Sequence, residues 1–145
     1  MKVSVNQAVI SSEATSVALN AAVKKANELN ININVSICDS GGNLAGFLRM
    51  PGAFLHSIDI AIDKAYTSAG FGFPTSQWND ILPVGTTFRE GIQMRDRLVS
   101  FGGGLPIDIG SALIGGIGVS GGSEEEDAIC AQAGIDAIQA TAASS

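Results

Sequence analysis

The sequence predicts an α+β domain in which helices pack against an antiparallel sheet. One observation is the order of the segments, which runs helix, two strands, helices, two or three strands and helix. A second is the turn Ser40-Gly41-Gly42-Asn43, which separates two β-favouring runs and is typical of a hairpin. Hairpins need no crossover helix, so successive strands favour antiparallel pairing, and residues 1–145 are predicted to form a single domain.

The helices are predicted from the spacing of apolar residues. Ser4-Val5-Asn6-Gln7 has the form of a capping box, which predicts a first helix of roughly 25 residues. Its apolar face would consist of Ile10, Ala14, Val17 and Ala21. A second amphipathic helix is expected over residues 53–70. Its buried stripe would consist of Leu55, Ile58, Ile62, Ala65 and Ala69. A third helix is expected to begin at the capping box Ser123-Glu124-Glu125-Glu126.

The strands are expected at residues 34–39 and 44–50 and, in two or three pieces, over residues 98–120. Asp108-Ile109-Gly110 would turn between the last two strands. Between the halves, residues 71–97 contain turn signals at Pro74, Pro83 and Gly85, which indicate short helices joined by loops.

Gly116, Gly118 and Gly121 have the G-x-G-x-x-G spacing of a dinucleotide-binding turn. That motif requires a second parallel strand after the helix, and the chain ends too soon to form one. Four carboxylates, at residues 124–127, would also repel a pyrophosphate from the helix start. We therefore interpret the motif as a glycine bend between strand and helix, with positive φ at Gly121 or Gly122.

Composition excludes some functions and favours self-association. The net charge is −6 and no basic residues cluster, so nucleic acid is not an expected partner. No apolar run is long enough to span a membrane, and the start lacks a signal-peptide core, so a cytoplasmic location is expected. Cys38 and Cys130 are expected to be reduced core thiols. Only 15% of the residues are charged and 18 are glycine, which favours exposed apolar patches and hence a homo-oligomer.

Three stretches of the chain resemble the GlcG/HbpS family, which also occurs as the C-terminal domain of PduO. They are VSICDSGGNLAGFLRMPGA, SIDIAIDKAYTSAGFGFPTS and GGGLPIDIGSALIGGIGVSGGSEEEDAICAQAG. The resemblance implies a profilin-like fold with a five-stranded antiparallel sheet between helices, and ring-like oligomers that are often octamers. It further implies haem binding or haem degradation, and genes that often lie in operons for glycolate, propanediol or glycerol breakdown.

Several residues are candidates for holding haem in a pocket lined by the second helix and the aromatic middle segment. His56, the only histidine, is expected in the first turn of that helix and could be an axial ligand, or simply a polar residue there. Tyr66 could ligate iron as a phenolate, or be a half-buried helix residue. Lys64 or Arg49 could pair with a haem propionate or a substrate carboxylate, or belong to a solvated face. The apolar slot would be formed by Phe71, Phe73 and Trp78.

Glu124 and Asp127 are three residues apart at the start of the last helix and could hold a hard cation such as iron. Carboxylates are favoured at a helix start in any case, which is the alternative explanation. Met50 and Met94 could be soft haem ligands but are expected in the core. A single histidine excludes a two-histidine iron site, so enzymatic activity, if there is any, would come from a bound cofactor.

The function predicted from the sequence is therefore that of a cytoplasmic, homo-oligomeric protein that binds haem and could degrade it. Two alternatives stay open. One is a non-catalytic accessory protein of a diol, glycerol or glycolate utilisation pathway that binds a small carboxylate or a corrinoid in the same cleft. The other is a structural scaffold whose ring assembly is itself the function.

Overall fold

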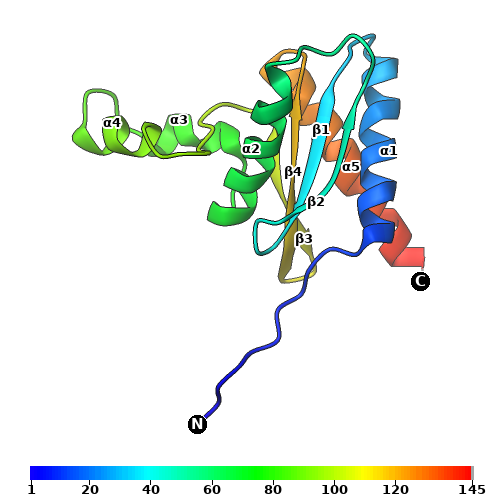
Figure 1. Cartoon of the computed structure of the whole chain (residues 1–145), viewed down its shortest axis with the longest axis horizontal. Helices are drawn as coiled ribbons and strands as arrows, with labels where there is room; N and C mark the ends of the chain where they lie inside the picture. The colour runs from blue at the N-terminus through cyan, green and yellow to red at the C-terminus, as the bar shows by residue number, and fades with distance from the viewer. Residues whose placement is uncertain (145) are drawn as a thin grey trace.

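A single antiparallel sheet organises the structure, a computed structural model that describes residues 1–144. Its strand order is β2-β1-β4-β3. The strands are β1 (Asn34–Asp39), β2 (Leu44–Arg49), β3 (Gly104–Ile109) and β4 (Ala112–Ser120). The helices α1 (Ser12–Glu28) and α5 (Glu124–Ser144) cover one face, and α2 (Ser57–Phe71) covers the other (Figure 1). The predicted α+β class, the hairpin β1–β2 and the turn at Gly110 are confirmed.

The expectation of five strands is wrong, because residues 1–144 contain four. The difference lies in residues 98–103, which form a loop before β3. Side chains from other elements accept hydrogen bonds from backbone N–H groups of this region. The Gly102 N–H donates to Glu124 Oε1 at 2.7 Å, and the Gly104 N–H donates to Thr75 Oγ1 at 2.9 Å. These contacts replace the hydrogen bonds that a further strand would make.

The main core lies between the sheet and the helix pair α1 and α5. Alternate residues of β1 and β4 face this side, because successive side chains of a strand point to opposite faces. The buried residues that fill the core from the sheet include Val35, Ile37, Ile107, Ile117 and Val119, and those from the helices include Ala18, Ala22, Ala26, Cys130 and Ile135. Cys38 is buried on the opposite face, and both cysteines are free, as expected for core thiols.

Glycines of the G-x-G-x-x-G motif allow α2 to pack directly on β4. A Cβ atom at Gly116 would collide with the Ala65 carbonyl oxygen, and one at Gly118 would collide with the Ala61 carbonyl oxygen. Gly121 has φ +151°, which confirms the predicted glycine bend between strand and helix. The motif therefore serves close backbone packing.

The first helix begins later than the capping box at residues 4–7 predicted. Ser11 is the N-cap of α1, and its hydroxyl accepts a hydrogen bond from the Ala14 N–H at 3.1 Å. Residues 1–9 are exposed and outside regular secondary structure, and the Ile10 N–H donates to the Ile114 carbonyl of β4. The prediction failed because a local capping pattern says nothing about where the core begins. The buried stripe of α1 also differs from the predicted one, and consists of Thr15, Ala18, Ala22 and Ala26.

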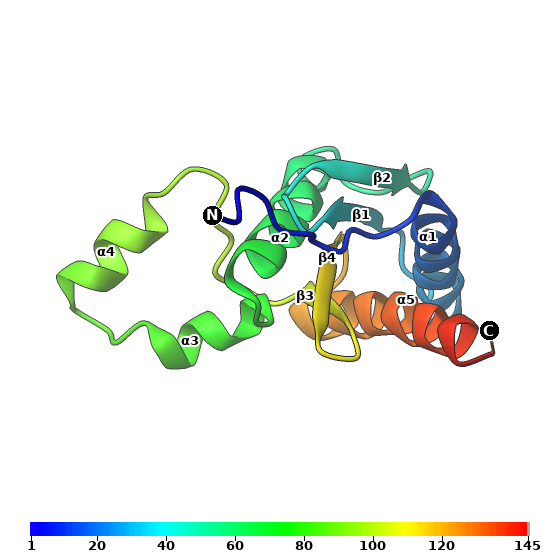
Figure 2. The same ribbon diagram turned by 90° about the horizontal axis from the view of Figure 1, so that it is seen from below.

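Residues 74–97 form an arm that stands away from the helix and sheet layers, in green and yellow-green in both views (Figures 1 and 2). We call this segment the projecting arm. It contains a short 3-10 helix (Thr75–Gln77), α3 (Trp78–Ile81) and α4 (Thr87–Gln93), which confirms the predicted short helices and loops. Within residues 1–144, no helix combines the length and apolarity that crossing a membrane requires.

Candidate functional site

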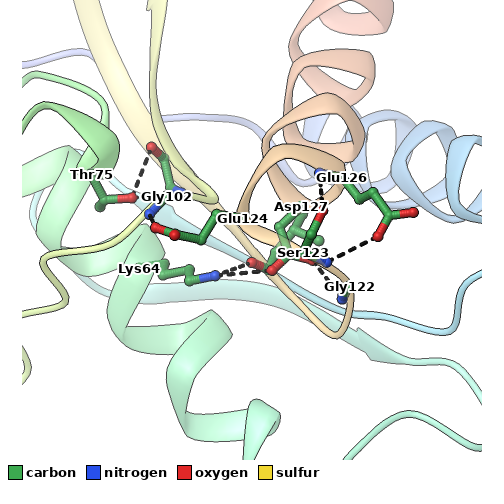
Figure 3. A network of polar contacts seen from close by, with 10 residues as sticks. Lys64, Thr75, Gly102, Gly122, Ser123, Glu124, Glu126 and Asp127 are labelled. Carbon is green, nitrogen blue, oxygen red and sulfur yellow. Dashed lines mark hydrogen bonds and ion pairs between the residues drawn. The ribbon is translucent and has the colours of Figure 1, made fainter.

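Lys64 is the centre of a polar contact network, which we call the buried polar junction (Figure 3). Its members Lys64, Thr75 and Asp127 are buried, and Glu124 is exposed. The side chain of Lys64 comes from the middle of α2 and is 1% exposed. Its ammonium donates to the Val119 carbonyl at 2.8 Å and to Asp127 Oδ2 at 3.2 Å. The ring centroid of Phe101 lies 5.1 Å from Lys64 Nζ. The junction therefore ties α2, β4 and α5 together.

Burial dominates the electrostatics of this ion pair. It lowers the pKa of the Lys64 ammonium, and the attraction of Asp127 offsets the shift only in part. It likewise raises the pKa of the Asp127 carboxyl, against the attraction of Lys64 and a hydrogen bond from the Gly122 N–H. Both directions express the free energy needed to remove charges from water. Lys64 contacts the protein's own groups here, and its predicted pairing with a haem propionate stays an untested prediction.

The proposed cation ligands, Glu124 and Asp127, also have partners within the chain. Glu124 accepts the Gly102 N–H, while Asp127 accepts the Gly122 N–H at 2.8 Å and pairs with Lys64. The capping box is confirmed, because the Ser123 N–H donates to Glu126 and the Glu126 N–H donates to Ser123. Among residues 1–144, no group of three or more histidine, cysteine or carboxylate side chains is arranged to hold a metal ion. Both carboxylates thus serve local structure, and a cation bound to them stays a prediction.

A cleft of about 380 Å³ lies between the C-terminal half of α2 and the end of the projecting arm. Its lining combines apolar and cationic side chains, and consists of Tyr66, Thr67, Gly70, Phe71, Ile92, Arg95, Asp96, Arg97 and Leu98. This volume falls within the range of small-molecule sites. We refer to it as the α2–arm cleft.

Arg97 fixes the shape of the α2–arm cleft. Its Nε donates to Asp63 Oδ1 at 3.1 Å, and its Cζ lies 3.6 Å from the ring centroid of Tyr66. Its carbonyl accepts the Thr67 hydroxyl at 2.9 Å. Arg97 has φ +64°, which is unfavourable for a residue other than glycine, so these contacts hold the chain in a strained turn. Arg95 is exposed and makes no ion pair within the described residues, which leaves its guanidinium open to a ligand anion.

The predicted aromatic residues cluster at the base of the arm. The ring centroids of Phe71 and Phe73 lie 4.8 and 5.0 Å from that of Trp78, both in edge-on geometry. Trp78 is buried and its Nε1 has no partner in the described part of the chain. Phe71 is half exposed and also lines the cleft. The cluster therefore anchors the arm, and it leaves one face of Phe71 accessible to a ligand in the cleft.

His56 and Arg49 lie at the other end of α2. His56 is the exposed residue before α2, and does not lie in the first turn as expected. Phe54 and Leu55, beside it, are also exposed. Arg49 Nη2 donates to the Ala53 carbonyl at 2.8 Å. At 1.5 Å per residue, His56 and Tyr66 are separated by about 15 Å along the helix. Within one chain, the two side chains therefore lie too far apart to bind the same iron.

The predicted site residues thus fall into four places: the buried polar junction, the α2–arm cleft, the aromatic cluster at the base of the arm and the surface around His56. Sequence reasoning missed Asp63 and Phe101 as partners and Arg95 and Arg97 as cleft residues. Arg95-Asp96-Arg97 is a visible charge cluster in the sequence. Its distance from α2 along the chain concealed the contact with Asp63.

These features define an α+β domain with an apolar, arginine-lined cleft, and comparison with known proteins gives its family. The model of the family described as "Haem degrading protein HbpS-like" matches residues 10–136. The chain belongs to this HbpS-like family, which confirms the resemblance recognised in its sequence.

Relatives and solved structures agree with this assignment. An uncharacterised 15.0 kDa protein in the dhaT–dhaS intergenic region of Citrobacter freundii is 39% identical over 114 residues, which cover 77% of this chain and 80% of that protein. The corrinoid adenosyltransferase PduO of Salmonella typhimurium is 38% identical over 120 residues, 81% of this chain but only 35% of PduO. This chain thus corresponds to about a third of that relative.

Two crystal structures extend the agreement to the fold. The Klebsiella pneumoniae protein ORFY has a TM-score of 0.91 at 34% identity, and the match covers 97% of both chains. The PduOC:haem complex has a TM-score of 0.82 at 34% identity, and covers 89% of this chain and 94% of the other.

Proposed function

We propose that this chain is a cytoplasmic, homo-oligomeric haem-binding protein whose α2–arm cleft receives the haem. One observation carries the proposal: a protein with the same fold and 34% identity forms a complex with haem. The family description, which names haem degradation, gives further support.

The residues of the cleft suit a flat apolar ring with anionic substituents. Phe71, Ile92 and Leu98 supply apolar walls, and the free guanidinium of Arg95 can pair with a propionate. Tyr66 is 38% exposed and carries a phenol that could ligate iron. When bound, the haem iron would supply the redox chemistry that degradation requires. The exposed apolar surface around His56 is the alternative location for the haem.

Titration with hemin, followed by the Soret band, tests this proposal through two matched pairs of variants. Tyr66→Phe and Arg95→Ala alter the cleft, whereas His56→Ala and Arg49→Ala alter the opposite end of α2. We expect Tyr66→Phe to shift the Soret band, and Arg95→Ala to weaken affinity by about 1–3 kcal/mol through loss of a charge-assisted hydrogen bond. The second pair should bind as the wild type does.

The opposite pattern would move the haem to the His56 surface and refute the location in the cleft. A broad, featureless spectrum shared by the wild type and all four variants would mean nonspecific binding, and would refute haem as the ligand.

A second candidate function is an accessory role in diol, glycerol or glycolate utilisation, with a corrinoid or a small carboxylate as ligand. The similarity to PduO, a corrinoid adenosyltransferase, favours it. Titration with hydroxocobalamin beside hemin distinguishes the two, since a corrinoid carrier should prefer the former. Binding of neither molecule by a stable oligomer would favour the ring scaffold instead.

A further inference from the structure

The outer part of the projecting arm, which includes α4, has little support from its own chain. No residue of α4 is buried. Large apolar side chains at its tip are exposed, namely Ile81, Val84, Phe88 and Met94, with Val84 at 87% and Met94 at 83%. A helix of seven residues is marginal in water without tertiary packing. Thr75, Trp78 and Leu82 are buried at the base of the arm, but α4 lacks the buried surface that would stabilise it.

Both ends of the arm are nevertheless fixed to the body. At the entry, Thr75 exchanges hydrogen bonds with Gly104 of β3, and the Phe71, Phe73 and Trp78 rings pack together. At the exit, Arg97 pairs with Asp63 of α2 despite its positive φ. Because both ends are fixed, the tip of the arm is held away from the body. Its apolar side chains are therefore more easily covered by another molecule than by the body of the same chain.

The net charge of the arm favours contact with a second copy of this chain. It carries three basic residues, Arg89, Arg95 and Arg97, and three acidic residues, Asp80, Glu90 and Asp96. The arm is therefore neutral, and the rest of the chain carries the whole net charge of −6. Two copies that approached through their bodies would repel each other, whereas two neutral arms with interspersed charges of both signs are self-complementary.

We propose that residues 74–97 are the contact through which two copies of this chain associate, arm against arm, about a two-fold axis. This rests on the homo-oligomer of the proposed function and names its surface. In such an isologous contact the same apolar residues meet on both sides, and the unpaired guanidinium of Arg95 can face an acidic residue of the other copy. The contact would bury the exposed tip and stabilise α4. It would also hold in place one wall of the α2–arm cleft, because Ile92 and Arg95 belong to the arm.

Light scattering of Phe88→Asp, with Ile129→Asp as the control, tests this contact. Both residues are half-exposed apolar side chains on helices, but Ile129 lies on α5 outside the arm. We expect the mass of Phe88→Asp to fall at least twofold at micromolar concentration, while Ile129→Asp keeps the wild-type mass. Far-ultraviolet circular dichroism checks that both variants are folded. A monomeric wild type would refute the proposed oligomer itself. An oligomeric wild type whose mass Phe88→Asp leaves unchanged would refute the arm contact alone.

Cysteine cross-linking tests the two-fold arrangement independently. The native thiols are buried, so a cysteine introduced at Val84, Phe88 or Met94 would be the reactive one. Mild oxidation should link at least one of these variants into a covalent dimer, and Ile129→Cys should stay unlinked. If none of the three arm variants forms a covalent dimer, the arms do not meet and the proposal is overturned.

Discussion

The buried polar junction and the projecting arm differ in how far their side chains are buried and paired within the chain. At the junction, the Lys64 ammonium and the Asp127 carboxylate are almost fully buried, and each has partners from other elements of the same chain. In the arm, large apolar side chains are exposed, and no residue of α4 is buried. The junction shows that buried charges of the body are paired within one chain. The exposed tip of the arm is the surface that we propose a second copy covers.

The largest expected effect is at the junction. Lys64→Met would leave the Asp127 carboxylate buried without its cation, and we expect the free energy of unfolding to fall by about 3–5 kcal/mol. Lys64→Met combined with Asp127→Leu should recover most of that loss, because no unpaired charge stays buried. Chemical denaturation of the single and double variants measures both values. A double variant no more stable than the single one would mean that packing, and not charge, governs this position.

A smaller effect is expected at the bend before α5. Gly121 has positive φ, and a Cβ atom there would collide with the Asn32 carbonyl oxygen. Gly121→Val should therefore destabilise the fold by at least about 1–2 kcal/mol. Gly122 does not have positive φ, so Gly122→Val is the control with the smaller expected loss. Equal stability of both variants and the wild type in thermal unfolding would contradict the strained geometry.

Arg97 lies where the body and the arm meet. Two substitutions there separate the cost of its strained backbone from the contribution of its side-chain contacts. Arg97→Ala and Arg97→Gly both lose the contacts with Asp63 and Tyr66, but only glycine tolerates φ +64° freely. We expect the glycine variant to be the more stable by about 1 kcal/mol. An alanine variant as stable as the glycine variant would show that the strain is absent.

The thiols give a prediction for pH. Burial raises the pKa of Cys38 and of Cys130 to about 11 from the usual 9.0, so both stay protonated at neutral pH. Because the folded-state pKa is raised, their contribution to stability is complete below pH 9 and is lost as the pH rises toward 11. A thiolate-specific reagent should label neither cysteine in the native protein and both after denaturation. Rapid labelling of the native protein would show that a thiol is accessible.

The sequence predicted those features that depend on local chemistry. The β1–β2 hairpin, the capping box at Ser123 and the bend at Gly121 each follow from neighbouring residues, and the structure confirms them. The start of α1 could not be predicted in this way, since it depends on where the core begins. The pairing of Lys64 with Asp127 joins residues far apart in the sequence, and the sequence predicted for Lys64 only a ligand carboxylate or a solvated helix face. A pocket between the second helix and the middle segment was expected, but Arg95 and Arg97 in its lining were missed for the same reason.

Native-state hydrogen exchange at several protein concentrations tests most directly whether the body is complete and the arm needs a second copy. Amides of α2 should be protected at every concentration, because α2 packs on β4 within the chain. Amides of α4 should be protected in concentrated protein and lose protection on dilution, as the arms separate. Protection of α4 that does not change with concentration would contradict this account, because the arm would then be stable within its own chain.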